Sequence, residues 1–258
     1  MPLLYTFSFA TGLIVGSFLN VLIIRLPQGK PPTGRSRCPH CTRLVRWFDL
    51  VPVISFLILR GRCRSCTHSL SWQYPLIELL TGIVFMLSAT AVQTLTPHPA
   101  LLSLALFRNW IVSSVLIFTA MVDLKHQIIF DVPLGFAAIA VFVLNISLGI
   151  SLWWCLLAGI IGISFFGLQY FFSKGRWIGG GDIVLGGFLG VTLSFPNILV
   201  ALALAYLMGT VAVLPLLVMK KYQWKSKIAF GAFLSCAGII TLLWGDHLRI
   251  WYLHLIFS

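Results

Sequence analysis

Residues 110–123 read WIVSSVLIFTAMVD, and residues 177–187 read WIGGGDIVLGG. The first stretch is an apolar run that ends on a carboxylate, Asp123, and the second places Asp182 directly after three glycines. A carboxylate at the boundary of a membrane span is costly to bury and is a functional candidate by default. The whole chain has only six acidic residues. The two stretches therefore predict membrane helices with a functional aspartate at one end of each.

The rest of the chain is as apolar as these two stretches. Of its 258 residues, 59% are hydrophobic and the mean hydropathy is +0.99, which is typical of a polytopic membrane protein. Since a helix needs roughly 20 residues to cross the hydrocarbon core, we expect an all-α fold with about eight transmembrane helices. The spans are expected at 3–24, 75–95, 101–122, 132–150, 152–172, 183–195, 197–219 and 228–245. The stretch 183–195 is short and glycine-rich, so a count of seven or nine stays open.

The lysines and arginines predict the orientation. With the N-terminus outside, the inner loops are 25–74, 123–131, 173–182 and 220–227, and they hold every one of the 18 basic residues except Arg108 and Arg249. Loops rich in these residues stay cytoplasmic, so both aspartates are expected at the cytoplasmic face. The net charge of +12 then reflects contact with anionic membrane lipids. No nucleic-acid partner is expected, because no soluble domain is large enough to organise one.

One soluble segment divides the chain. Residues 1–24 are expected to form the first span, 25–74 a cytoplasmic cysteine domain, and 75–258 a multi-helix membrane domain. The first span has no basic residue before its apolar core and is expected to be retained rather than cleaved. No internal repeat is evident.

The cysteine domain carries two CxxC pairs with 21 residues between them: Cys38, Cys41, Cys63 and Cys66. Disulfides are rare in a reducing cytoplasm, and four thiolates in two CxxC pairs suit tetrahedral Zn²⁺. We expect a zinc-ribbon-like loop, with unliganded or redox-active cysteines as the alternative. A saturated Cys₄ site has no open position, so the metal would fold the loop and not hydrolyse a substrate. His40 and His68 are expected to flank the site without binding metal.

Two carboxylates that share a proton can hydrolyse a peptide bond, because one activates water while the other protonates the carbonyl or the leaving nitrogen. Asp182 precedes a helix, whose N-terminal dipole would stabilise the anion, whereas Asp123 ends a helix, whose dipole would disfavour it. Asp182 is therefore expected to be the more acidic partner. The alternative for Asp182 is a simple helix cap. That role does not suit Asp123, which lies at the wrong end of its helix.

Neighbouring residues are candidates for support. Gly179 and Gly181 would permit positive φ and the close approach of a substrate backbone. Asp131 either caps the span that it begins or supports the site. Glu78 lies near the start of the second span and needs a base or a polar cavity; its possible partners are Arg60, Arg62 and Arg64.

Several motifs in order resemble one family. They are GSFLNVLIIRLP (16–27), SRCPHC (36–41), FDLVPVISFLILRGRCRSC (48–66), YPLIELLTG (74–82), VDLKHQIIFDV (122–132) and GGGDIVL (179–185). Together they resemble the bacterial type IV prepilin leader peptidases, also called prepilin peptidase/N-methyltransferases, a family of membrane GxGD aspartic peptidases. A late segment, IAFGAFL (228–234), resembles the family's FGPFL-type motif with alanine in place of proline.

The resemblance implies that Asp123 and Asp182 are the catalytic pair and that the four cysteines of 25–74 bind zinc. It implies cleavage of the basic leader of prepilins and pseudopilins, in type IV pilus or type II secretion systems, at the cytoplasmic face of the inner membrane. It also implies methylation of the new N-terminal amine with S-adenosylmethionine, and Glu78 is a candidate for that methyl-transfer site.

Two other classes of function compete. An intramembrane GxGD protease of the presenilin or signal-peptide-peptidase type would pair Tyr-Asp with GxGD, whereas Val122 precedes Asp123 here, and it would have no CxxC loop. A non-enzymatic transporter or assembly scaffold would place polar residues near the bilayer midplane. The two aspartates lie instead at the edge of their spans, which favours cleavage of a segment that emerges from the membrane.

Overall fold

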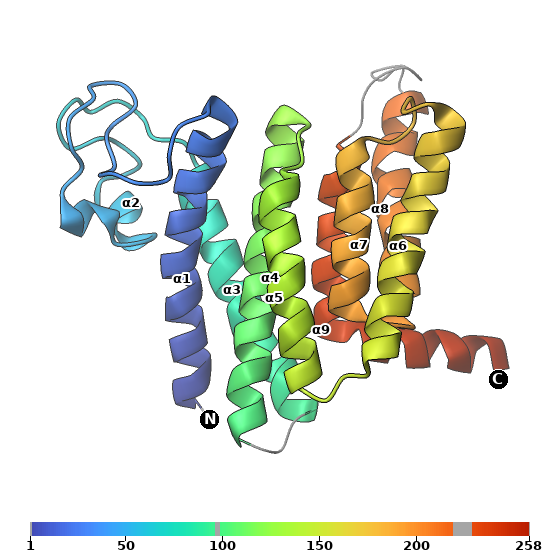
Figure 1. Ribbon diagram of the computed structural model, residues 1–258. Coiled ribbons are helices and arrows are strands. Elements are labelled where there is room, and N and C mark those ends of the chain that lie inside the picture. Colours follow the sequence, from blue (N-terminus) through green and yellow to red (C-terminus); the bar gives the residue numbers. More distant parts are fainter. Residues whose placement is uncertain (1, 96–98, 219–228, 258) are drawn as a thin grey trace. The chain divides into compact units, whose positions relative to one another are not determined.

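The computed structural model describes residues 2–95, 99–218 and 229–257, and within these ranges the chain is helical without β-strands (Figure 1). The chain divides into two compact units, residues 1–94 and 95–258, and each is described here by itself. The helices of unit 1 are α1 (Pro2–Arg25), η1 (Leu26–Gln28), η2 (Trp47–Leu50), α2 (Ile54–Ile58) and α3 (Gln73–Leu95). Those of unit 2 are α4 (Pro99–His126), α5 (Asp131–Ser147), α6 (Leu152–Ser173), α7 (Gly180–Leu193), α8 (Asn197–Val218) and α9 (Phe230–Phe257).

Each of the eight expected apolar stretches forms a helix. Six of these, in α1, α3, α4, α6, α8 and α9, are long and apolar enough to cross a membrane, while α5 and α7 have only 17 and 14 residues. In hydrocarbon a backbone must satisfy its own hydrogen bonds, and a helix does so within one segment. The all-α fold and the multi-pass membrane character are therefore confirmed.

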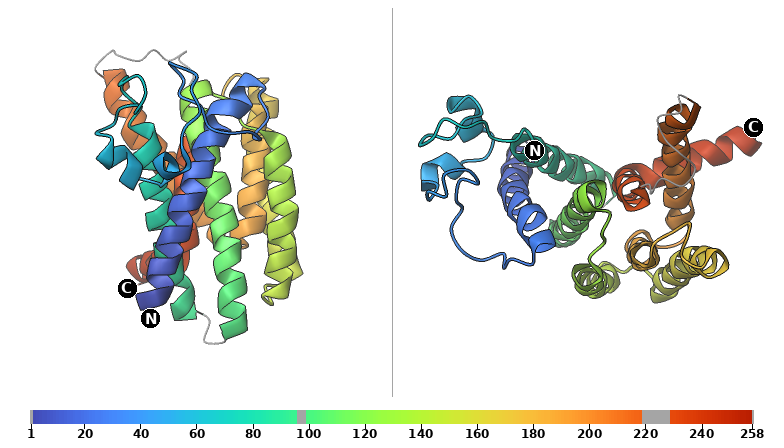
Figure 2. Two further views of the ribbon diagram at one scale, coloured as in Figure 1. Left: turned by 90° about the vertical axis from the view of Figure 1, so that its left-hand side faces the viewer. Right: turned by 90° about the horizontal axis from the view of Figure 1, so that it is seen from above.

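In unit 1, α1 and α3 pack backbone against backbone. A Cβ added to Gly12 would lie 2.7 Å from the Gly82 Cα, and one added to Gly16 would lie 2.8 Å from the Glu78 Cα. Small residues allow such close approach between membrane helices. The segment 26–72 connects the C-terminus of α1 to the N-terminus of α3 and lies beside that end of the pair (Figures 1 and 2).

Unit 2 brings four helix ends together. The C-terminus of α4 and the N-termini of α5, α7 and α9 lie at one end of the unit (Figure 1). α6 and α7 pack closely through glycines, since a Cβ on Gly162 would meet the Gly186 carbonyl and one on Gly190 would meet the Ala158 carbonyl. A core of buried apolar side chains, among them Leu116, Phe166 and Phe188, holds the helices together.

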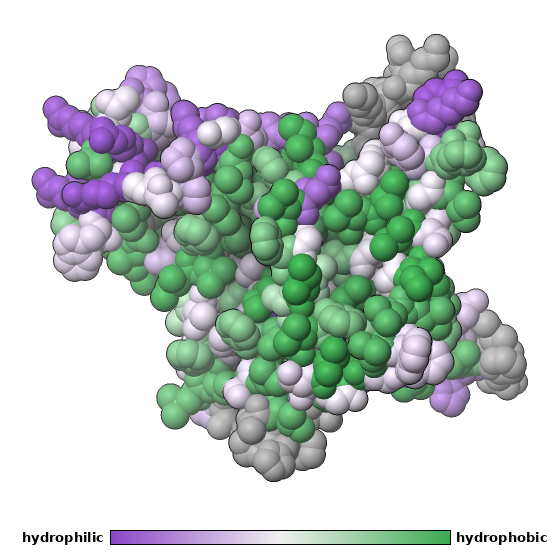
Figure 3. Space-filling model, viewed as in Figure 1, coloured by the Kyte–Doolittle hydropathy of each residue, from purple (hydrophilic) through white to green (hydrophobic). Residues whose placement is uncertain are grey.

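The surface matches a membrane environment. Apolar side chains cover the flanks of the helices, and polar residues gather over the 26–72 segment (Figure 3). Phe136 and Ile139 of α5 and Ile160 of α6 are more than half exposed. Apolar surface of this extent is a liability in water, but it costs nothing against lipid tails, which are equally apolar.

Candidate active site and metal centre

Asp123 lies one turn before the end of α4 and is only 5% exposed. Its Oδ2 accepts a hydrogen bond of 2.9 Å from the backbone N–H of Ala232, in the first turn of α9. A Cβ added to Gly231 would lie 2.9 Å from the same oxygen, so only glycine fits there. The expectation that Asp123 cannot act as a cap is wrong, because it caps a helix other than its own.

Asp182 is the third residue of α7 and is 7% exposed. Its Oδ2 accepts a hydrogen bond of 3.0 Å from the backbone N–H of Gly179, the N-cap residue of α7. Its Oδ1 is enclosed and has no hydrogen-bond partner among the described residues. Capping therefore occupies one oxygen of Asp182 and leaves the other available.

The two aspartates meet in one corner of unit 2. Ile129, between α4 and α5, lies beside the glycine next to each aspartate. A Cβ on Gly181, which precedes Asp182, would lie 2.6 Å from the Ile129 Cβ, and one on Gly231, which contacts Asp123, would lie 2.8 Å from the Ile129 Cδ1. Asp123 is close enough to Asp182 to act on it electrostatically. Because each carboxylate accepts a bond at the N-terminus of a helix, the prediction that only Asp182 has this stabilisation is wrong.

The supporting residues have other roles than those expected. Gly179 has φ of −78° and neither Gly180 nor Gly181 has positive φ, so the expected need for positive φ is wrong. Position 181 requires glycine, because Ile129 occupies the space that a larger side chain would need. Asp131 is the exposed first residue of α5, and Phe130 rather than Asp131 holds the N-cap position.

Sequence reasoning missed two parts of this site. One is the backbone of Gly231 and Ala232, which the FGPFL-like motif at 228–234 could have indicated. The other is Tyr206 of α8, which lies near enough to Asp182 for an electrostatic interaction, donates a 2.8 Å hydrogen bond to Gln169 Oε1 and packs on the Phe230 ring. The signal for Tyr206 was a phenolic hydroxyl within a largely apolar span.

The four predicted zinc ligands converge in unit 1. The Sγ atoms of Cys38, Cys41, Cys63 and Cys66 all lie within 4.8 Å of one another. Cys38 and Cys66 are 3.8 Å apart, too far for a disulfide. That separation equals the edge of a tetrahedron of thiolates around Zn²⁺, roughly 3.8 Å for Zn–S bonds of about 2.3 Å. The geometry fits a Cys₄ zinc site, and the His40 and His68 rings stack on each other beside it.

The two CxxC pairs are copies of one structure. Cys38 N–H donates to the Arg43 carbonyl and Cys63 N–H to the His68 carbonyl, at 3.0 and 2.9 Å. Thr42 and Thr67, each following the second cysteine of its pair, have φ of 57° and 55°. The expectation of no internal repeat is wrong at this scale. The signal was RCxxCT, which occurs at 37–42 and again at 62–67.

The thiols of the cluster differ in acidity. Hydrogen bonds from the backbone N–H groups of Cys66 and Ser65 lower the pKa of Cys63 to about 7. At Cys66 a bond from the His68 backbone lowers the pKa, but burial and the neighbouring thiols outweigh it and raise the pKa to about 11. One thiolate therefore forms readily, and its negative charge repels each further thiolate. A bound cation would relieve this repulsion.

Glu78 of α3 is 6% exposed. Its Oε2 accepts a 2.8 Å hydrogen bond from the backbone N–H of Val53. Val53 has φ of 62°, which is rare for a β-branched residue, so the Glu78 bond secures an unfavourable backbone. The expected arginine partner is wrong, because Glu78 forms no ion pair among the described residues and Arg64 pairs with Asp49 at 2.7 Å.

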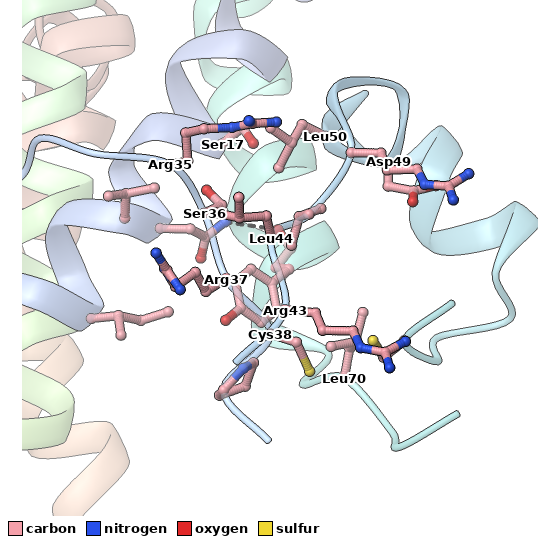
Figure 4. A pocket seen from close by; sticks show the side chains of 18 of the residues that line it. Ser17, Arg35, Ser36, Arg37, Cys38, Arg43, Leu44, Asp49, Leu50 and Leu70 are labelled. Carbon is pink, nitrogen blue, oxygen red and sulfur yellow. Dashed lines mark hydrogen bonds between the residues drawn. The ribbon is translucent and has the colours of Figure 1, made fainter. Parts of the chain in front are cut away.

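Glu78 lines a cavity of about 870 Å³ within unit 1. Figure 4 shows part of its lining, with Arg35, Arg37 and Arg43 among the labelled side chains. The walls come from the end of α1, the 26–72 segment and the start of α3. Their charged residues are mostly basic: Arg25, Lys30, Arg35, Arg37, Arg43, Arg46 and Arg64, against Asp49 and Glu78. The Arg25 guanidinium stabilises the cavity wall, because it donates hydrogen bonds to the backbone carbonyls of residues 32–35.

Comparison with known proteins gives the family of the chain. Residues 10–92 match the bacterial peptidase A24 N-terminal domain, and residues 110–214 match the type IV leader peptidase family. A prepilin leader peptidase/N-methyltransferase of Aeromonas hydrophila is 32% identical, over 98% of this chain and 95% of the relative. One of Stutzerimonas stutzeri is 32% identical over 94% and 91%, and a type 4 prepilin-like proteins leader peptide-processing enzyme of Escherichia coli is 32% identical over 94% and 93%. No solved structure is significantly similar. The chain belongs to the type IV leader peptidase family.

Proposed function

We propose that this protein is a membrane aspartic endopeptidase that removes the leader of type IV prepilins or pseudopilins, with Asp123 and Asp182 as the catalytic pair. One observation carries the proposal: α4 and α7 place two nearly buried carboxylates in the same corner of unit 2. Two such groups cannot both ionise cheaply when close, so they share a proton. The sharing supplies a base and an acid at once.

The hydrogen bonds suggest how each carboxylate would work. Each holds one oxygen against a backbone N–H at a helix N-terminus, which fixes the carboxyl plane. The Oδ1 of Asp182 is buried without a partner among the described residues, so it is the oxygen left to accept a hydrogen bond from the attacking water when the substrate binds. One carboxylate then takes the proton of that water while the other protonates the substrate carbonyl or leaving nitrogen.

The distribution of basic residues supports a cytoplasmic active site and an N-terminus outside. Segment 25–74 is rich in lysine and arginine, which places it on the cytoplasmic side. Segment 123–131 begins two spans further along the chain and therefore lies on the same side of the membrane. By the family resemblance, prepilins carry their leader on the cytoplasmic side of the inner membrane. An active site at the membrane edge meets the leader where it emerges from the bilayer.

The relatives' names also include N-methyltransferase, and the cavity of unit 1 supports this second activity. Its volume of about 870 Å³ suits a ligand of cofactor size. S-adenosylmethionine carries a carboxylate and a positive sulfonium, and the cavity offers arginines such as Arg35 and Arg43 for the first and Glu78 for the second. Of the two acidic residues that the structure describes in unit 1, Asp49 pairs with Arg64, whereas Glu78 forms no ion pair. When bound, S-adenosylmethionine supplies the methyl group for the new N-terminal amine.

Zinc would have a structural role in this assembly. The cluster of Cys38, Cys41, Cys63 and Cys66 would give a Cys₄ site without an open position. Zinc therefore supports the 26–72 segment, which forms much of the cavity wall, and takes no part in hydrolysis.

Cleavage of a membrane-inserted prepilin tests the peptidase. We expect Asp123→Asn and Asp182→Asn each to lower kcat by at least a thousandfold while the protein keeps its zinc and its thermal transition. Asp246→Asn is the matched control, because Asp246 pairs with Arg249 on the surface of α9. Near wild-type cleavage by either dyad variant would refute the two-aspartate mechanism.

Ligand binding tests the methyl-donor site. S-adenosylhomocysteine lacks the transferable methyl group and with it the positive sulfonium charge, and it is otherwise the same as S-adenosylmethionine. If Glu78 faces the sulfonium, Glu78→Gln weakens binding of S-adenosylmethionine at least tenfold and that of S-adenosylhomocysteine much less. Equal losses for the two ligands would mean that Glu78 acts only on Val53 and the cavity wall.

A further inference from the structure

α7 ends where its backbone lacks donors. Its 14 residues span about 21 Å, less than the roughly 30 Å of a hydrocarbon core, and its last residues Thr192 and Leu193 are buried within the protein. Pro196 has no N–H to donate to the Thr192 carbonyl four residues earlier. The Phe195 N–H donates to the Trp154 carbonyl at 3.3 Å instead of to Val191. Two carbonyls of α7 therefore need donors from other helices.

Two side chains of neighbouring helices supply them. Arg108 of α4 donates through Nη2 to the Thr192 carbonyl, and Asn145 of α5 donates through Nδ2 to the Val191 carbonyl at 2.8 Å. The described residues include all six acidic residues of the chain, and none of them forms an ion pair with Arg108. The charge of Arg108 is instead balanced by the negative end of the α7 dipole.

α4 carries a residue near each end of α7: Arg108 bonds to its C-terminal end, and Asp123 lies close enough to Asp182 at its N-terminal end to act on it electrostatically. Arg108 and Asp123 are 15 residues apart on α4, about 22 Å, and Asp182 and Thr192 are 10 residues apart on α7, about 15 Å. The difference of about 7 Å is covered by the long arginine side chain. We propose that Arg108 is a positioning residue of the peptidase: its bond to the C-terminus of α7 sets the axial position of Asp182 opposite Asp123.

Packing against α6 also holds α7. Gly162 and Gly190 bring the two backbones into contact. The Phe166 ring and the Ile163 side chain of α6 lie against glycines of α7, so this packing itself restrains the helix. The bond from Arg108 adds a directional restraint at the C-terminal end of α7.

The chain contains its own reporter for this bond. Cys155 of α6 is fully buried, and its Sγ lies 3.2 Å from the Ser194 Oγ and 3.7 Å from the Asn145 Nδ2. Release of the end of α7 exposes this thiol. Labelling of Cys155 by a membrane-permeant maleimide, quantified by peptide mass spectrometry, therefore reports on the position of α7 without any measurement of activity.

The experiment compares Arg108→Met, Arg108→Lys and Asn145→Leu with wild type, in the full-length protein in nanodiscs. Arg249→Gln is the matched control, since Arg249 pairs with Asp246 near the C-terminal end of α9. We expect Arg108→Met to lower kcat for leader cleavage at least tenfold, to leave KM within twofold and to raise Cys155 labelling at least fivefold. Arg108→Lys, which keeps a cationic donor, restores part of both readouts, and Asn145→Leu gives a smaller loss in the same direction.

Three results would overturn the proposal: an unchanged kcat despite raised labelling, a lowered kcat with Cys155 still protected, or an effect on KM alone. If Arg108→Met does not fold, the lysine and Asn145 variants decide the question by the same criteria. The kcat readout rests on the proposed peptidase function, whereas the labelling readout does not. Asp182→Asn separates the two, because it should abolish cleavage and leave Cys155 protected.

Discussion

Gly231→Ala offers the sharpest test of the geometry at Asp123. The added Cβ would lie 2.9 Å from the Asp123 Oδ2 and 2.8 Å from the Ile129 Cδ1, whereas ordinary contacts begin near 3.4 Å. Asp123 must shift by about half an ångström, and its bond to the Ala232 N–H, now 2.9 Å, is lost or bent. Hydrogen bonds to charged groups contribute about 1.5–3 kcal/mol. At about 1.4 kcal/mol per factor of ten, kcat/KM for leader cleavage should fall roughly 10- to 150-fold.

The assay is cleavage of a membrane-inserted prepilin by purified protein, with zinc content and thermal unfolding measured on the same samples. Gly135→Ala, in α5, is the matched control, because nothing lies within 4 Å of its added Cβ. That variant should cleave normally and be as stable as wild type or slightly more so, since alanine favours a helix by about 1 kcal/mol over glycine. The reasoning fails if Gly231→Ala cleaves within twofold of wild type while Gly135→Ala does the same.

Three further predictions concern unit 1. One zinc per chain should be found by elemental analysis, and a chelator should make the 26–72 segment sensitive to protease; a metal-free wild type that resists protease would contradict the Cys₄ site. In zinc-stripped protein, alkylation of Cys63 should rise through pH 7, because its pKa of about 7 makes it a thiolate above that pH; a midpoint near pH 8.5, the ordinary value, would show that the backbone bonds do not form. Gly12→Ala should lower stability by about 1–3 kcal/mol, because the added Cβ would lie 2.7 Å from the Gly82 backbone, whereas Gly167→Ala has open space and should not.

Arg108 and Asp182 act on opposite ends of α7 by the same electrostatic principle. α7 is short, and each of its ends holds a charge of the sign that a helix dipole favours there. Partial charges of this kind act strongly where water is excluded. The helix that carries Asp182 is thereby oriented by electrostatics as well as by packing.

Much of this protein could be predicted from its residues alone. Apolar runs of about 20 residues predict membrane helices, so the eight long helices of the described residues were expected, and α7 was expected to be short, whereas the five-residue α2 was not expected. The spacing of Cys38, Cys41, Cys63 and Cys66 predicted the sulfur cluster that the structure shows, because CxxC pairs are local geometry. Asp123 and Asp182 were singled out because charges in spans are rare.

Only the tertiary structure decided what surrounds these residues. Asp123 caps α9, which lies more than 100 residues further along the chain, and no local pattern reports a bond of that range. Glu78 binds the Val53 backbone and not an arginine, because the fold of 26–72 turns that N–H inward and leaves Arg64 to Asp49. Periodicity and motif spacing are properties of neighbours in sequence, whereas the partner of a buried charge is chosen by which helix ends the fold brings together.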